Sequence, residues 1–126
     1  MKKENNISPS ELKILEVLWE KSPLSSSQIV DKLEKTESWH SRTIKTLITR
    51  LVKKKFVGYE QENNRYFYFA LLAKNDYQQR TSLHFIHRIF GGKISPLVAH
   101  FAQQKKLSKE DINEIKAILK GLDDHD

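Results

Sequence analysis

Residues 39–59 read WHSRTIKTLITRLVKKKFVGY, and at helical spacing this stretch separates an apolar stripe from a basic, hydroxyl-rich one. The apolar residues recur three and four positions apart, so they share a helix face that should pack into a core; they are Ile44, Leu47, Ile48, Leu51 and Val52. The opposite face carries Arg42, Thr43, Thr46, Thr49, Arg50 and Lys53. Between Glu37 and Glu60 there are six Lys or Arg residues and no acidic one, so neighbouring carboxylates do not cancel the positive potential.

This combination of residues is suited to DNA. Lys and Arg neutralise phosphates, while Thr hydroxyls reach phosphate oxygens or base edges. The stretch therefore predicts a helix that lies in DNA. A solvated surface helix is the alternative that the charge pattern alone leaves open.

Composition sets the outer limits. The chain has 126 residues, enough for one ordinary domain or for a small domain with a helical extension. No apolar run approaches the ~20 residues that cross a bilayer, and the start, MKKENN, lacks the apolar segment of a secretory signal. We therefore expect a cytoplasmic protein with no membrane insertion. The absence of cysteine excludes disulfides, thiolate metal sites and cysteine nucleophiles, and the net charge of +6 favours an acidic partner.

Residues 1–73 read as three helices followed by two strands. Ser8 should cap the first helix, with Pro9 at its first position, Glu11 completing a capping box and an end near Lys21. Its apolar stripe consists of Leu12, Ile14, Leu15, Leu18 and Trp19. A second capping box at Ser25 and Gln28 should begin a short helix with Ile29, Val30 and Leu33 on its apolar face, and Ser41 is a plausible cap for the basic helix.

After the basic helix the periodicity changes to two. Residues 56–61 and 66–71 predict two strands, joined by a tight turn at residues 62–65, which contain two Asn. Helix, short helix, basic helix and hairpin is the order of a winged helix-turn-helix, in which the third helix enters the major groove. We therefore predict DNA contacts from Ser41, Arg42, Thr43, Lys45, Thr46, Thr49, Arg50, Lys53 and Lys54, and from Arg65 at the hairpin tip. The aromatic residues 66–69 could instead form a stacking platform for single strands, but strand aromatics more often complete a small core.

Residues 74–126 predict helices and carry no strand signal. One helix should stop at Gly91-Gly92, a short one should open near Pro96, and Ser108 to Asp111 should cap the last. Short amphipathic helices gain most of their stability from packing, so we expect their apolar faces to meet the same region of a second subunit, the alternative being the amino-terminal domain. The residues predicted at this homodimer interface are Leu83, Ile86, Phe90, Leu97, Phe101, Ile112, Ile115, Leu119 and Leu122. The expected fold is thus mainly α with a small β-hairpin: a winged-helix DNA-binding domain over residues 1–73 and a helical dimerisation domain over residues 74–126.

The chain resembles the BlaI/MecI/CopY family of penicillinase repressors. The resemblance lies in residues 43–51, TIKTLITRL, followed by Lys53, Lys54 and Phe56, with Trp19 and Trp39 where the family usually has tryptophan. It implies a dimeric winged-helix transcriptional repressor on a palindromic operator, in a family concerned with antibiotic resistance.

The resemblance also bears on how repression ends. The family's penicillinase repressors are inactivated when a sensor-linked protease cuts an Asn-Phe bond, and the aligned pair here is His100-Phe101. A copper-sensing branch uses a cysteine motif that a chain without Cys cannot use. Lys55 stands where the family commonly has Gly just after the recognition helix; if the backbone there is left-handed, a non-Gly residue costs roughly 1 kcal/mol.

Catalysis finds little support. His84 and His87 lie three apart, a spacing that could place both imidazoles on one metal, but no third ligand is recognisable. His40 beside Ser41 is no more than proximity in sequence, and no Gly-rich phosphate loop or nucleophile elbow occurs. We therefore expect no enzyme, no cofactor and no metal. A winged-helix module that binds RNA or protein rather than duplex DNA remains the alternative function.

Overall fold

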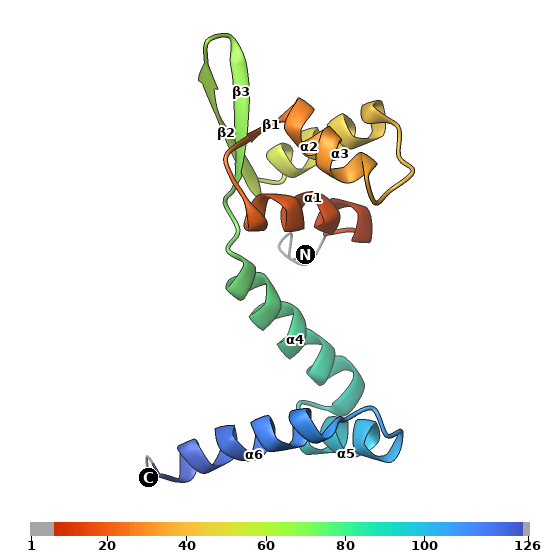
Figure 1. The fold of residues 1–126 in the computed structure, drawn as a ribbon. Helices are drawn as coiled ribbons and strands as arrows, with labels where there is room; N and C mark the ends of the chain where they lie inside the picture. Colours follow the sequence, from red (N-terminus) through yellow and green to blue (C-terminus); the bar gives the residue numbers. More distant parts are fainter. Residues whose placement is uncertain (1–6, 125–126) are drawn as a thin grey trace. The chain divides into compact units, whose positions relative to one another are not determined.

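The computed structural model describes residues 7–124, which form six helices and a small antiparallel sheet (Figure 1). The chain divides into two compact units, the first ending at Thr81 and the second beginning at Ser82. This division falls inside a helix, whereas the sequence prediction placed the boundary just before it. In order, the elements are α1 (Pro9–Glu20), β1 (Leu24–Ser25), α2 (Ser26–Glu34), α3 (Ser41–Lys53), β2 (Val57–Glu62), β3 (Arg65–Ala70), α4 (Lys74–Phe90), α5 (Ser95–Gln103) and α6 (Lys109–Asp124).

Local capping determines where the first two helices begin. The Glu11 N–H donates to Ser8 Oγ at 3.1 Å, and the Ser8 N–H donates to Glu11 Oε1 at 2.9 Å. Ser25 and Gln28 repeat this reciprocal pair with distances of 3.2 and 2.9 Å at the start of α2. Both predicted capping boxes are confirmed, because each needs only side chains three residues apart.

The predicted cap of α3 is wrong by one residue. Ser41 is the first residue of the helix, and His40 is the N-cap, its Nδ1 accepting the Arg42 N–H at 3.0 Å. An imidazole nitrogen here does what a Ser or Asp oxygen does at most N-caps. A search for the usual capping residues therefore overlooks it.

The hairpin has the predicted form, but both strands lie one residue closer to the turn, which leaves only Asn63 and Asn64 between them. Its register runs from Val57 opposite Ala70 to Glu62 opposite Arg65. Asn63 and Asn64 have φ values of 52° and 66°, as the two central residues of a type I′ turn require. A third strand was not predicted: β1 pairs antiparallel with β3, giving the order β1-β3-β2. Two residues are too few to show a period.

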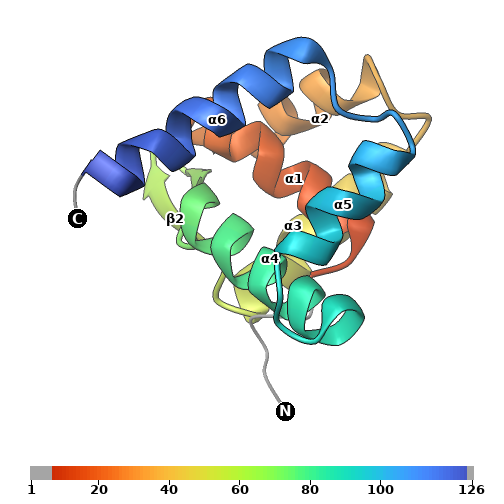
Figure 2. The ribbon, with the colours of Figure 1, turned by 90° about the horizontal axis from the view of Figure 1, so that it is seen from below.

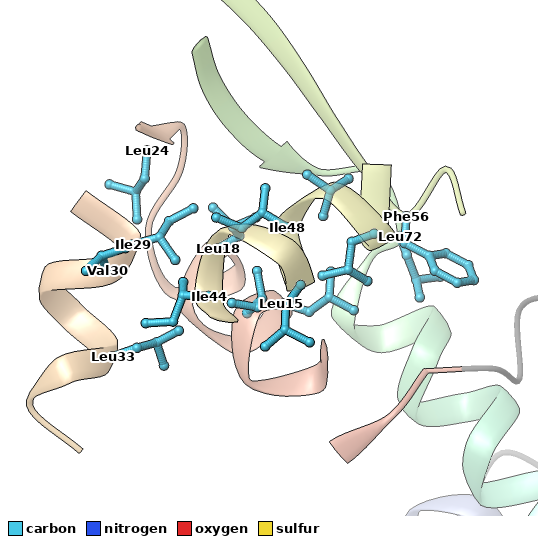
Figure 3. Packing of buried hydrophobic residues seen from close by; sticks show 14 residues of the cluster. Leu15, Leu18, Leu24, Ile29, Val30, Leu33, Ile44, Ile48, Phe56 and Leu72 are labelled. Carbon is cyan, nitrogen blue, oxygen red and sulfur yellow. The ribbon is translucent and has the colours of Figure 1, made fainter. Parts of the chain in front are cut away.

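The core of the first unit lies between α1, α2, α3 and the base of the hairpin (Figure 3). The predicted stripes of all three helices contribute, although Val52, Leu12 and Trp19 are only partly buried. Trp19 Nε1 donates to the carbonyl of Leu72 at 2.8 Å, which ties α1 to the chain after β3. The buried apolar residues are Ile14, Leu15, Leu18, Leu24, Ile29, Val30, Leu33, Ile44, Leu47, Ile48, Leu51, Phe56, Val57 and Leu72.

The second unit consists of the rest of α4, with α5 and α6 following through short connections (Figure 2). Gly91 and Gly92, with φ values of 62° and 87°, end α4, as their sequence predicts. Ser108 and Asp111 exchange capping bonds of 2.9 and 3.1 Å at the start of α6. No side chain described between Ser82 and Asp123 is fully buried. Among residues 7–124, no helix is long and apolar enough to cross a membrane.

Candidate nucleic-acid interface

Helix α3 has one buried and one exposed face. Ile44, Leu47, Ile48 and Leu51 are at most 5% exposed, so apolar burial determines which face of the helix is turned to the core. Seven of the residues predicted to contact DNA are exposed on the helix, and Ser41 is half-buried at its start. The seven are Arg42, Thr43, Lys45, Thr46, Thr49, Arg50 and Lys53. We call these four cationic and three threonine side chains the α3 basic face.

Two threonines on the α3 basic face use their hydroxyl protons within the helix. Thr46 Oγ1 donates to the carbonyl of Arg42 at 2.9 Å, and Thr49 Oγ1 donates to that of Lys45 at 3.0 Å. A hydroxyl has one proton and two acceptor lone pairs. In this arrangement each threonine therefore presents an acceptor, rather than a donor, to whatever lies against the helix.

Lys54 differs from the other predicted contacts. Its Nζ donates to both carboxylate oxygens of Glu11, at 2.8 and 3.0 Å, and it lies at the C-cap of α3. Glu11 is 1% exposed. Burial raises the pKa of the Glu11 carboxyl, but the Lys54 ammonium and the capping bonds with Ser8 outweigh it and leave the pKa below its ordinary value. The Glu11 carboxyl is therefore ionised at neutral pH.

Arg65 lies at the base of the hairpin turn and points back toward α2. Its Nη2 donates to Ser25 Oγ at 3.4 Å, and its guanidinium carbon lies 5.8 Å from the centre of the Phe67 ring. Between the start of α2 and the hairpin is a shallow hollow with hydroxyl, amide and guanidinium groups in its lining. The lining residues are Ser25, Ser26, Ser27, Gln61, Asn64, Arg65, Tyr66 and Tyr68.

The aromatic residues of the hairpin divide between its two faces. Tyr66 and Tyr68 share a face with Tyr59 of the neighbouring strand, and Tyr59 stacks on Tyr66 with ring centres 4.6 Å apart. Tyr68 packs against the core, and its burial, followed by the nearby Tyr66 and Tyr59, raises its pKa. Tyr59 and Tyr66 are 46% and 45% exposed, so of these three rings only Tyr68 packs against the core, and the core interpretation holds for Tyr68 but not for Tyr66.

The residues predicted at the dimer interface are exposed or half-buried in the second unit. Leu83, Phe101, Ile112, Leu119 and Leu122 are between 38% and 61% exposed. Ile86, Phe90, Leu97 and Ile115 are half-buried. Sequence reasoning missed Phe85 and Ile94, which are also exposed, because neither falls on the stripe used for prediction.

His100 and Phe101 lie inside α5, and both are exposed, with ring centres 5.4 Å apart. His84 and His87 are exposed on α4. Within the described part of the chain no three His, Asp or Glu side chains are placed to hold a metal ion.

Comparison with known proteins gives relatives over almost the whole chain. Residues 7–121 match a family described as penicillinase repressor. The methicillin resistance regulatory protein MecI of Staphylococcus aureus strain N315 is 32% identical over 117 residues, which are 93% of this chain and 95% of MecI. The penicillinase repressor of Bacillus licheniformis is 33% identical over 119 residues, covering 94% of this chain and 93% of that protein.

Two solved structures agree with the first unit. The DNA-binding domain of the repressor BlaI has a TM-score of 0.54 and 32% identity, covering 60% of this chain and 93% of that domain. Monomeric Bacillus licheniformis BlaI in complex with the blaP half-operator has a TM-score of 0.52 and the same identity and coverage. Both support the winged-helix fold of the part that carries the α3 basic face.

Proposed function

The chain belongs to the penicillinase repressor family, and from this premise we propose that it represses transcription by binding duplex DNA as a homodimer on a palindromic operator. The observation that carries the proposal is the α3 basic face, which is exposed, cationic and held on a rigid core. The solved relative in complex with a half-operator favours duplex DNA over the alternative of an RNA or protein ligand. Such a repressor acts where the DNA is, which in bacteria is the cytoplasm.

The roles along α3 follow from position. Residues in the first turns of a recognition helix reach base edges most directly, so we assign Arg42, Thr43 and Thr46 to readout. Because the Thr46 hydroxyl donates its proton to the Arg42 carbonyl, it offers DNA a hydrogen-bond acceptor. The donors in the major groove are the amino groups of adenine and cytosine. Arg50 and Lys53, farther along the helix, are assigned to phosphates, and Ser41, Lys45 and Thr49 are assigned to phosphates as well.

The hairpin supplies a second contact with the backbone of the DNA. Arg65 is held by Ser25 and Phe67 beside the start of α2, where the helix dipole favours an anion. We propose that a phosphate lies in the hollow between α2 and the hairpin.

Dimerisation is proposed for the second unit. Its apolar side chains are exposed over all three helices, and isolated short helices do not retain such faces without a partner. Two copies that join through this unit would bring two α3 basic faces to half-sites about one turn, ~10 bp, or a multiple of it apart.

Release by a sensor-linked protease at His100-Phe101 is proposed on the resemblance of that segment and on the exposure of both residues. The bond lies inside α5, so cleavage requires that helix to open first. A cut there would separate α6 from the rest of the chain and remove apolar surface from the dimer interface. Mass spectrometry of the protein from inducing cells tests this: a fragment ending near residue 100 supports it, and derepression with only intact chain excludes it.

The experiment that tests DNA binding uses duplexes recovered from genomic DNA by the protein itself. The logarithm of the affinity for the recovered duplex should fall linearly with the logarithm of the salt concentration, and binding should survive an excess of structured RNA. Arg50→Ala should weaken recovered and scrambled duplexes alike and lower the salt slope by ~1. Binding that structured RNA abolishes would overturn the assignment to duplex DNA.

A further inference from the structure

An ion pair between Glu11 and Lys54 links the start of α1 to the end of α3. Glu11 lies in the first turn of α1, and Lys54 is the C-cap of α3, 43 residues later. The Glu11 side chain is 2% exposed and that of Lys54 is 32% exposed, so the carboxylate is enclosed while the lysine stem reaches it from the rim. Glu11 Oε1 also accepts the Ser8 N–H, so one carboxylate caps α1 and holds the end of α3.

The same end of α3 is closed by its own backbone. The Lys55 N–H donates to the carbonyl of Val52 and the Phe56 N–H to that of Leu51, both at 3.0 Å, which is the Schellman pattern. This pattern defines where the helix stops but not how the helix is oriented on the rest of the domain. The Glu11–Lys54 pair is an ionic contact that links the helix end to a different element.

Orientation matters for a helix that reads bases. Thirteen residues of α-helix span ~20 Å, so a tilt of about 5° displaces the far end by roughly 2 Å. Hydrogen bonds tolerate a few tenths of an ångström around 2.9 Å. A small change in how α3 sits on α1 would therefore cost base contacts while the helix, the core and the positive charge all remain.

We propose that Glu11 and Lys54 are positioning residues for operator recognition: their ion pair fixes α3 on α1, and specific binding depends on it although neither residue contacts DNA. The inference rests on the proposed function of α3. It also reassigns Lys54, which the basic pattern of the sequence places with the phosphate contacts. Replacing both partners of a buried pair by apolar residues is often close to neutral, but removing one partner leaves the other charge uncompensated and lowers stability. The loss of operator preference is therefore measured where each variant is still folded.

Matched substitutions separate positioning from phosphate contact. Glu11→Gln keeps an oxygen for the Ser8 N–H but removes the charge, and Lys54→Met keeps the length of the stem. Each variant should lower the ratio of the affinity for the recovered duplex to that for the scrambled duplex by about tenfold. This lies within the ~5- to 150-fold that one good base contact provides. The salt slope should stay unchanged. The double variant should lose no more than either single one, because both remove the same contact. Lys54→Arg should retain most of the ratio.

Lys53→Met is the control, since the same substitution one residue earlier removes an exposed cation from the α3 basic face. It should lower the salt slope by ~1 and weaken both duplexes alike. If Lys54→Met behaves in this way while Glu11→Gln changes nothing, Lys54 is a phosphate contact and the proposal is wrong. All variants are compared at a temperature where circular dichroism shows that they are folded, which excludes simple unfolding as the cause. If Glu11→Gln does not fold, the contrast between Lys54→Met and Lys54→Arg decides whether the ion pair positions α3.

A second measurement does not depend on DNA. Amide hydrogen exchange in the intact protein should become faster at residues 50–56 in Glu11→Gln and in Lys54→Met, and stay unchanged in Lys53→Met. Unchanged exchange in the first two variants would overturn the proposal. A wild-type protein that bound no duplex preferentially would contradict the proposed function, and the exchange result would still decide whether the ion pair positions α3.

Discussion

Lys55 occupies a backbone conformation that suits glycine. Its φ is 69°, and its N–H closes the Schellman pattern after α3. The condition attached to the sequence-based prediction, that this backbone stays left-handed, is therefore met. A left-handed non-Gly residue costs about 1–2 kcal/mol, and glycine loses about 0.4–1 kcal/mol through the extra freedom of the unfolded chain.

Lys55→Gly should therefore stabilise the protein by about 1 kcal/mol. Lys55→Ala is the control, because it removes the same charge but keeps a Cβ in the left-handed backbone. Urea unfolding of both variants checks this. A glycine variant no more stable than the alanine variant would contradict it.

Glu11 makes the stability of the first unit depend on pH. Its pKa is lowered below the ordinary value of 4.5, because the Lys54 ammonium and the capping bonds with Ser8 outweigh the opposing effect of burial. The unfolded chain therefore binds the proton more tightly, so this contribution is present above about pH 4.5 and is lost as the pH falls below that value. Thermal unfolding from pH 7 downwards should show a steeper loss for the wild type than for Glu11→Gln. Parallel curves for the two proteins would show that the carboxylate makes no such contribution.

At the scale of elements, the sequence predicts helix α3 and which of its faces is buried, but not all the contacts that its side chains make. The spacing of Ile44, Leu47 and Ile48 reports burial directly, and the two capping boxes need only residues three apart. The His40 cap was missed because imidazole is an uncommon acceptor there. The Lys54 contact could not be predicted, since nothing in the local sequence shows that α1 brings a carboxylate to that position. Strand β1 is two residues long and is defined by its pairing with β3, so the local sequence does not predict it.

Thr46 tests the proposed readout by α3. Its hydroxyl proton is bound to the Arg42 carbonyl, so the side chain offers an acceptor to an adenine or cytosine amino group. Thr46→Val keeps the shape and removes that acceptor, and should relax the preference at one base position by ~1–3 kcal/mol. Competition binding with single-base variants of the recovered duplex measures this. Thr46→Ser, which keeps the hydroxyl, should retain the preference; if Thr46→Val also retains it with unchanged affinity, the assignment of this residue is wrong.

Helix α6 tests the proposed dimer. Ile115 is half-buried and Leu119 is 54% exposed, although both are apolar. Ile115→Glu with Leu119→Glu should break association, because burying a carboxylate in an apolar interface is costly. Sedimentation should then find monomers, while amide hydrogen exchange in α1, α2 and α3 stays unchanged. Glu114→Lys, an exposed change on the same helix, is the control and should leave the dimer intact.

For the whole molecule, the two units divide the work of a repressor. The first presents the α3 basic face on a packed core, and the second carries the exposed apolar residues through which we propose that two copies join. Joining would make the second half-site contact effectively intramolecular, so we expect the affinity for an inverted repeat to exceed that for either half-site by ~10²–10⁴. Loss of the dimer, by substitution or by cleavage, would remove that gain while each winged-helix unit remains folded.

The most direct test of this central claim is the light-scattering mass of the complex with the recovered duplex. One chain has a mass of 14.8 kDa. We expect the mass of the duplex plus two chains, with no detectable complex of one chain per duplex at any ratio of protein to DNA. A stable complex with a single chain on the full site would contradict the proposal that this protein recognises its operator as a homodimer.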